Sequence, residues 1–180
     1  MLVAASGLAR EALAVLRAHK LYDVIGILDD ASALSDKSID GVPIVGTTEA
    51  VIDYPDAQLL VCAGKGLVRE KIVARLDALG VSQHRYGVLI HPSVDVPEGC
   101  HVGAGSIILR GVALTTAVDI GAHVVVMPNA VLTHDCVLQD YATLCAGSVL
   151  GGAVVVGRGA YLGMNSAVRE GALIGAGAIL

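Results

Sequence analysis

The sequence predicts an α/β domain followed by an all-β parallel β-helix. From Val88 to the end, the third residue of every hexad is a branched aliphatic, beginning with Ile90 and ending with Leu180. The first residue of each hexad from Cys100 on is Ala, Cys, Ser or Val. An unbroken period of six with an aliphatic stack and a small-residue stack is typical of a parallel β-helix, in which each coil buries one layer of core. A β-sandwich of short strands does not explain so strict a period.

Three hexads, or 18 residues, would complete one triangular coil, with coils about 4.8 Å apart as hydrogen-bonded strands are. Glycines recur at the fourth place of the hexad, just after the inward aliphatic. We expect a positive φ at this fourth place, because glycine adopts it without steric cost. These glycines are Gly103, Gly121, Gly151, Gly157, Gly163 and Gly175.

Composition limits the possible functions. The net charge is −5 and the Lys and Arg residues do not cluster, so we expect no nucleic-acid partner. No apolar run approaches 18 residues and no basic segment precedes an apolar one at the N-terminus. We therefore expect neither a membrane span nor a signal peptide. The four cysteines are Cys62, Cys100, Cys136 and Cys145, and their spacing is not that of metal ligands. We therefore expect them to be small buried side chains in a reducing compartment, and we expect no bound metal.

Residues 1–90 alternate strands and helices, with a domain boundary near residue 90 and residues 91–180 forming the β-helix. We expect strands at 2–5, 24–28, 59–62 and 85–90, and helices at 8–19 and 67–79. Ser6 is the expected N-cap of the first helix, and Gly80 the C-terminal cap of the second. Residues 31–41 are expected to be a polar loop. Residues 42–45 are expected to form at best an edge strand, because they carry Pro43. Val68, Ile72, Leu76 and Leu79 are expected to form the apolar side of the second helix, with Arg69 elsewhere.

Polar and glycine residues follow the ends of the predicted strands. Ser6 and Gly7 form a shortened phosphate-type loop at a helix start, where backbone N–H groups attract anions. Asp29 and Asp30 end the second strand, where carboxylates accept hydrogen bonds from a ribose or a base. Gly64 and Lys65 follow the next buried strand, with Lys65 suited to a diphosphate. The alternatives are a tight turn, a solvated polar loop and a surface lysine, respectively.

One corner of the repeat carries an unusual pair. His134 and Asp135 occupy the fifth and sixth places of a hexad, outside the packed interior. A carboxylate beside a histidine favours the imidazolium and can orient the ring, so His134 is a candidate general base. For His91, His101 and His123 we expect surface positions without such a setting.

The chain resembles the hexapeptide-repeat sugar acyltransferases. They include N-acetyltransferases of nucleotide-linked 4-amino sugars and sialic-acid-type O-acetyltransferases. The resemblance is carried by segments 5–7, 28–30, 90–93, 133–137 and 160–166, and it covers essentially the whole chain. It implies a Rossmann-like N-terminal domain, a left-handed β-helix and a homotrimer with its sites between neighbouring subunits. It also implies a cytoplasmic enzyme of polysaccharide biosynthesis.

The resemblance further implies roles for individual residues. His134 would be the base and Asp135 its partner. Gly152 would contact the thioester carbonyl of acetyl-CoA through its N–H. The acetyl-CoA cleft would include Thr143, Gly163 and Met164. The nucleotide sugar would lie against Ser6, Gly7, Asp29 and Asp30. Gly64 and Lys65 are further candidates for binding it because of their place after a strand, not because of the resemblance.

Three departures from the family pattern accompany this resemblance. Thr143 stands where relatives usually carry a second histidine, and Ala4 and Leu8 stand where relatives tend to have glycine and histidine. The sequence also ends in mid-coil, so we expect its C-terminal cap to be missing. The predicted reaction is acetyl transfer to the amino group of a nucleotide-linked amino sugar. The alternatives are transfer to a sugar hydroxyl and a non-catalytic trimer that binds nucleotide sugars. A γ-type carbonic anhydrase would need three zinc histidines, whose spacing is not reproduced here.

Overall fold

The structure is a computed structural model that describes residues 1–35 and 37–180. It divides into two compact units, an α/β unit and a β-helical unit, so the predicted fold class is confirmed. The first unit comprises Met1–Gly64 with Val68–Gly87, and the second comprises Lys65–Leu67 with Val88–Leu180. No helix in these described ranges is both long and apolar enough to cross a membrane.

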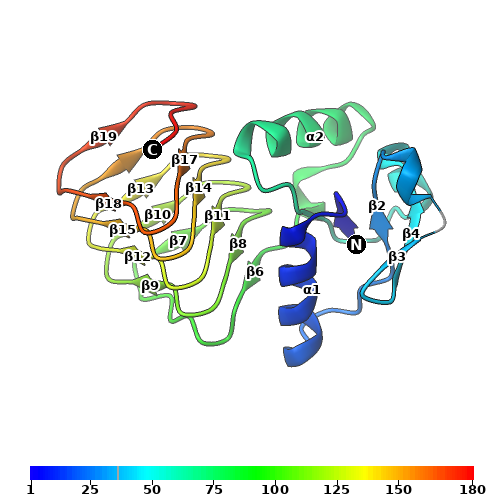
Figure 1. Ribbon diagram of the computed structural model, residues 1–180, viewed down its shortest axis with the longest axis horizontal. Coiled ribbons are helices and arrows are strands. Elements are labelled where there is room, and N and C mark those ends of the chain that lie inside the picture. The colour runs from blue at the N-terminus through cyan, green and yellow to red at the C-terminus, as the bar shows by residue number, and fades with distance from the viewer. Residues whose placement is uncertain (36) are drawn as a thin grey trace. The chain divides into compact units, whose positions relative to one another are not determined.

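The first unit is built on a mostly parallel sheet in the order β3-β4-β2-β1-β5 (Figure 1). Strand β1 lies between β2 and β5 and is parallel to both, so the carboxyl ends of these strands share one edge of the sheet. That edge is where ligands bind in open α/β sheets. The strands are β1 (Leu2–Val3), β2 (Ile27–Leu28), β3 (Ser38–Ile39), β4 (Val42–Gly46) and β5 (Leu60–Val61).

The helices of this unit begin and end close to where the sequence predicts. Ser6 caps the first helix, since its Oγ accepts a hydrogen bond from Ala9 N at 3.3 Å. After the second helix, Gly80 has φ +84°, as a glycine C-terminal cap does. The helices are α1 (Gly7–His19) and α2 (Gly66–Ala78), with 3₁₀ turns η1 (Ser32–Leu34), η2 (Thr48–Asp53) and η3 (Gln83–Arg85).

Three predictions for this unit were wrong. Within residues 31–41, the described residues include η1 and strand β3, and β3 pairs antiparallel with β4. Strand β4 therefore has neighbours on both sides, although it carries Pro43. The buried side of α2 carries Arg69, Val73 and Leu76, because the Arg69 guanidinium donates to the carbonyls of Ala63 and Gly64 at 2.7 and 3.0 Å.

The second unit is a left-handed parallel β-helix whose two-residue strands stack into three faces (Figure 1). In chain order each coil passes the first, second and third face, and strands pair with a shift of 18 residues, as Asp119 with Val137. The first face holds β7 (His101–Val102), β10 (Asp119–Ile120), β13 (Val137–Leu138), β16 (Val155–Val156) and β19 (Leu173–Ile174). The second holds β6 (Leu89–Ile90), β8 (Ile107–Ile108), β11 (Val125–Val126), β14 (Thr143–Leu144) and β17 (Tyr161–Leu162). The third holds β9 (Ala113–Leu114), β12 (Val131–Leu132), β15 (Val149–Leu150) and β18 (Ala167–Val168).

The segment predicted as one strand, 85–90, is divided between the two units. Tyr86 forms a bridge with Leu59 in the first unit. Leu89 and Ile90 pair with Ile107 and Ile108, so β6 is the first strand of the β-helix.

The core of the β-helix follows the hexad as predicted. Third-place aliphatics and first-place small residues form one continuous buried cluster that includes Ile120, Leu138, Cys136 and Ala142. Since each coil adds one more layer of the same kind, the core needs neither Phe nor Trp.

The prediction for the fourth-place glycines was wrong. The positive φ angles recur at the sixth place, at residues such as Asn129, Asp135 and Gly147. The fourth-place glycines have a different reason, since a Cβ on Gly121 or Gly151 would lie 2.6 and 2.5 Å from atoms of the next coil. They allow successive coils to approach closely, which is glycine's other common use.

Candidate active site

His134 and Asp135 meet at the corner between β12 and β13. Nδ1 of His134 lies 2.7 Å from Oδ2 of Asp135, and the two side chains are 61% and 62% exposed. Adjacent side chains usually point apart, and here the turn brings them together because Asp135 has φ +60°. The Asp135 N–H donates to the carbonyl of Thr116 in the preceding coil at 3.1 Å, which fixes this turn to the stack.

Gly152 lies in the next coil directly beside the His134 ring. A Cβ on Gly152 would be 2.3 Å from both Cε1 and Nε2 of His134, so only glycine leaves room for the imidazole. Ala153 N donates to the carbonyl of His134 at 2.8 Å. Among the described residues, no acceptor receives the Gly152 N–H, so this donor remains available beside the ring.

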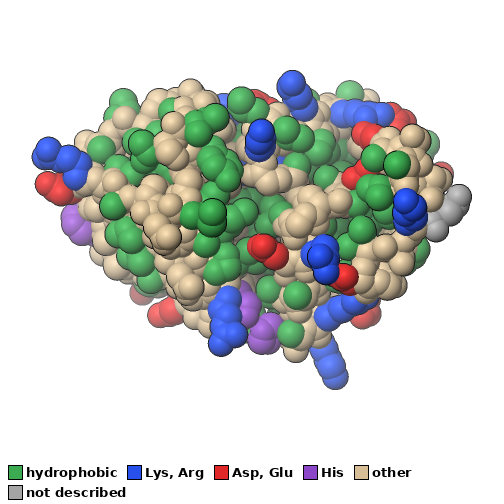
Figure 2. Space-filling model, in the orientation of Figure 1, with side chains coloured by type: hydrophobic (Ala, Val, Ile, Leu, Met, Phe, Trp, Pro, Cys, Tyr) green, Lys and Arg blue, Asp and Glu red, His purple; other side chains and the backbone are tan. Residues whose placement is uncertain are grey.

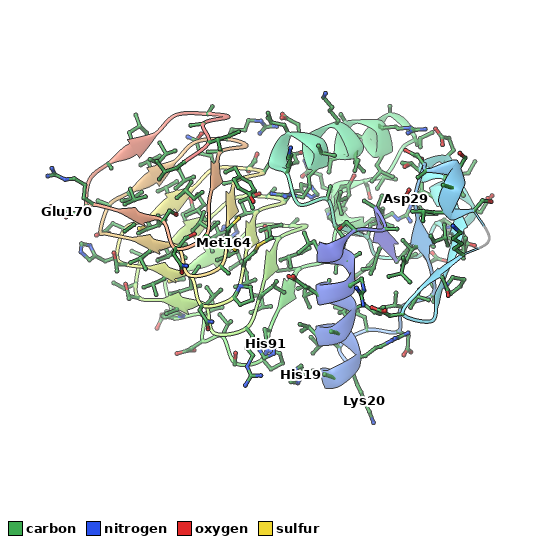
Figure 3. All side chains as sticks on the ribbon, viewed as in Figure 1. His19, Lys20, Asp29, His91, Met164 and Glu170 are labelled. Atoms are coloured by element: carbon green, nitrogen blue, oxygen red, sulfur yellow. The ribbon has the colours of Figure 1, made fainter. Side chains whose placement is uncertain are left out.

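The other residues predicted for the acetyl-CoA cleft lie on different sides of the same coils. Thr143 is in β14 on the second face and is fully buried. Gly163 and Met164 form the corner between the second and third faces, and Met164 is 75% exposed (Figure 3). Of the residues predicted for catalysis and for acetyl-CoA, a single chain therefore brings together only His134, Asp135 and Gly152.

The structure contains a second imidazole–carboxylate pair that sequence reasoning missed. Nδ1 of His101 lies 3.2 Å from Oδ1 of Asp119, and both side chains are exposed. The expectation that His101 has no carboxylate beside it was therefore wrong. The two residues are 18 apart in sequence, which is one coil, and that spacing is the signal that could have found the pair.

A surface position was expected for His91 and His123 as well, and this expectation was wrong, because they are only 9% and 5% exposed. The His91 ring accepts a hydrogen bond from Ser93 N at 3.0 Å. The His123 ring stacks on Tyr141 with centroids 5.2 Å apart, and the two residues occupy the sixth place of hexads one coil apart.

In the first unit, the Asp29 carboxylate accepts hydrogen bonds from two loops at the carboxyl edge of the sheet. Asp29 Oδ2 accepts from Ala5 N at 2.7 Å, and Oδ1 accepts from Ala31 N at 2.8 Å (Figure 3). Ser6 Oγ donates to the carbonyl of Cys62, which joins the loop after β1 to the end of β5. Gly7 opens α1 with free space where a Cβ would be.

Asp30 forms an ion pair with a helix residue of the same unit. Its Oδ2 accepts from Arg75 Nη1 at 2.6 Å, and its Oδ1 accepts from Thr48 N at 2.8 Å. Arg75 also contacts Glu49, and it lowers the pKa of that carboxyl. Asp30 is thus held in place by a cation and a backbone N–H.

A cavity of about 440 Å³ opens beside the two aspartates. Sequence reasoning missed most of its lining, because residues of β4 contribute as well as those that follow β2. The lining consists of Asp29, Asp30, Ala31, Ser32, Ser35, Ile44, Val45, Gly46 and Thr47. Gly64 and Lys65 are absent from this lining; the Gly64 carbonyl accepts from Arg69, and Lys65 is exposed.

Neither a cysteine nucleophile nor a metal site is supported by the described residues. Burial raises the pKa of Cys62 to about 12, and burial also raises the pKa of Cys136. Both thiols therefore stay protonated at neutral pH and are poor nucleophiles. Within residues 1–35 and 37–180, no group of His, Cys, Asp and Glu is arranged to hold a metal ion.

Family models match both units. Residues 1–76 match the PglD N-terminal domain, and residues 117–152 match the bacterial transferase hexapeptide with six repeats. The chain thus combines a PglD-type N-terminal domain with bacterial transferase hexapeptide repeats, and its similarity to solved sugar acetyltransferases identifies it as an enzyme of that kind.

Solved structures agree over nearly the full length of the chain. A mutant of perosamine N-acetyltransferase from Caulobacter crescentus, in complex with CoA and GDP-perosamine, is 28% identical with a TM-score of 0.85 and covers 99% of this chain and 86% of its own. The acetyltransferase domain of PglB from Neisseria gonorrhoeae, in complex with acetyl coenzyme A, is 26% identical with a TM-score of 0.67 and covers 99% and 88%. WeeI from Acinetobacter baumannii, at 21% identity and a TM-score of 0.61, covers 99% and 93% and shares the fold.

Proposed function

We propose that this chain transfers the acetyl group of acetyl-CoA to the amino group of a nucleotide-linked amino sugar, with His134 as general base. The observation that carries the proposal is the fixed triplet of His134, Asp135 and Gly152 on one exposed corner. The complexes of similar enzymes with CoA, acetyl coenzyme A and GDP-perosamine support the choice of substrates.

The His134–Asp135 contact selects the nitrogen that takes the proton. Asp135 holds Nδ1 at 2.7 Å, so the neutral imidazole donates Nδ1–H to the carboxylate and keeps a lone pair on Nε2. Nε2 removes the proton of the sugar amine as the nitrogen attacks the thioester carbonyl. A base held in this way contributes roughly 10²–10⁴ in rate.

Gly152 would stabilise the negative charge that develops on the thioester oxygen. Its N–H lies beside the imidazole and has no acceptor among the described residues. One such donor contributes about 10²–10³ in rate. The C–S bond then breaks, and the imidazolium gives its proton to the leaving CoA thiolate, which returns His134 to its neutral form.

We infer that the active form is a homotrimer with acetyl-CoA bound between neighbouring chains. His134 and Gly152 lie on one corner, whereas Gly163 and Met164 lie on another, so one chain cannot surround the acyl donor. Thr143 is fully buried within its own chain, so we do not assign it a contact with the acyl donor. Three copies arranged around an axis would put one kind of corner beside the other.

We infer that the nucleotide sugar occupies the 440 Å³ cavity beside Asp29 and Asp30, close to Ser6 and Gly7. The first N–H groups of α1 suit the diphosphate, and Gly64 would lie along the same edge. The free cysteines of the described chain suit a cytoplasmic location, where thiols stay reduced.

The test is a free-thiol assay with acetyl-CoA and a panel of UDP- and GDP-linked amino sugars. The His134→Ala variant is expected to lose at least about a hundredfold in kcat while the trimer survives. The control is His84→Ala, an exposed histidine of η3 in the other unit, which is expected to keep full activity. Full activity in His134→Ala would exclude the proposed base. Acetylation of hydroxy sugars alone would assign transfer to oxygen, and inactivity of the wild type with every sugar would favour a binding protein.

A further inference from the structure

The outward side chains of the first face change character along the axis of the β-helix. In successive coils they are His101, Asp119, Val137, Val155 and Leu173, which pair in register. The two residues before the coil of His134 are polar and exposed, and those from that coil onward are apolar. Figure 2 shows hydrophobic side chains scattered over the side of the β-helix that faces the viewer.

The four strands of the neighbouring third face present no such polar group. Their outward side chains are apolar, namely Ala113, Val131, Val149 and Ala167. The His134 corner joins the third face to the first. His101 and Asp119 are thus the only ionisable side chains that the described strands of these two faces present next to this corner.

The pair lies within reach of a molecule that reacts at His134. Asp119 is the register partner of Val137, and neighbouring strands are about 4.8 Å apart. Val137 follows His134 by three residues, which span at most about 10 Å. The bond from Asp135 N to the Thr116 carbonyl joins the same two coils at this corner. A pyranose ring with its substituents bridges distances of this order.

We infer that His101 and Asp119 form the subsite for the pyranose ring of the acceptor, an inference that rests on the proposed function. The Asp119 carboxylate accepts hydrogen bonds from ring hydroxyls, and the His101 ring accepts one through Nε2, because its Nδ1–H faces Asp119 at 3.2 Å. The apolar residues from Val137 onward suit the pantetheine arm of the acyl donor instead. The sugar and the acyl donor would then approach His134 from opposite directions along the coil axis.

The test is steady-state kinetics of the full chain with acetyl-CoA and the best nucleotide sugar from the panel. Asp119→Asn and His101→Gln are each expected to raise the KM for the sugar about tenfold, which corresponds to about 1.4 kcal/mol. The KM for acetyl-CoA is expected to change less than twofold. Asp95→Asn, an exposed carboxylate in the turn before β7, is the matched control and is expected to leave both constants unchanged.

Sedimentation and thermal unfolding of each variant separate this subsite from a contact between subunits. An unchanged KM for the sugar would overturn the inference, whether or not the oligomeric state changes. A KM for acetyl-CoA that rises alone would overturn it as well. An inactive wild type would contradict the proposed function itself, and that result is distinguishable from an active wild type whose Asp119→Asn variant behaves normally.

Discussion

Ala4 adopts a backbone conformation that its side chain disfavours. It has φ +74° at the turn between β1 and α1, where the left-handed region costs an L-residue about 1–2 kcal/mol. We expect Ala4→Gly to raise the free energy of unfolding by about 0.5–1 kcal/mol, after allowing for the larger chain entropy of unfolded glycine. Urea unfolding monitored by circular dichroism measures the change.

The neighbouring residue provides the control for Ala4. Ala5 has no positive φ, and its N–H donates to Asp29. Ala5→Gly is therefore expected to lower the free energy of unfolding by about 0.5–1 kcal/mol. Equal effects of the two substitutions would show that the turn at Ala4 carries no strain.

Individual site residues could be predicted where their contacts are local in sequence. His134 and Asp135 are adjacent, so the pair was visible as a pattern, and the structure confirms their contact. His101 and Asp119 are one coil apart, and nothing local links them. The hydrogen bonds of Asp29 to Ala5 and Ala31 likewise depend on the order of strands in the sheet, which the sequence does not state.

At the scale of the coil, two adjacent glycines have different partners. A Cβ on Gly152 would strike the His134 ring at 2.3 Å, whereas a Cβ on Gly151 would strike the backbone N of Glu170 at 2.5 Å. We expect Gly152→Ala to displace the imidazole and lower kcat at least about a hundredfold, with little loss of stability. The ring can rotate into solvent, since His134 is 61% exposed.

Gly151→Ala is the comparison, because it adds the same methyl group one residue earlier. A backbone cannot move aside as a side chain does, so we expect a loss of about 1–3 kcal/mol in the free energy of unfolding. Activity and urea unfolding, measured on both variants, check the contrast. Normal kcat in Gly152→Ala would mean that the observed position of the ring is not needed for catalysis.

The coil also shows where periodicity is informative and where it misleads. The inward places of the hexad were predictable because only aliphatic or small side chains fit a stacked core. The prediction of a positive φ at the fourth place was wrong, since glycine there avoids a clash between coils. The positive φ of the sixth place is shared among Gly, Asn, Asp, His, Tyr and Ala, so no single residue type marks it. In α2, Arg69 was misplaced because its burial depends on the carbonyls that end β5.

For the whole molecule, the sequence predicted two kinds of structure and a change between them near residue 90. The structure divides near the same position, with β6 as the first strand of the β-helix. Candidate ligand groups in the first unit follow parallel strands, and those in the second occupy corners of coils. Which corners would meet in the proposed trimer depends on contacts between chains, and no pattern within one chain encodes these directly.

The two ligand sites that we propose, one in each unit, predict separable kinetic effects. Ala31 lines the 440 Å³ cavity with an exposed side chain, and its backbone N–H is already bonded to Asp29. We expect Ala31→Phe to fill part of the cavity and raise the KM for the nucleotide sugar at least about tenfold, while the KM for acetyl-CoA stays within twofold. Ala14→Phe, on an exposed position of α1 outside the cavity lining, is expected to change neither constant. Isothermal titration calorimetry with the nucleotide sugar measures its binding directly. Unchanged binding in Ala31→Phe would show that the cavity does not hold the nucleotide sugar, and the proposal for the His134 corner would then stand without it.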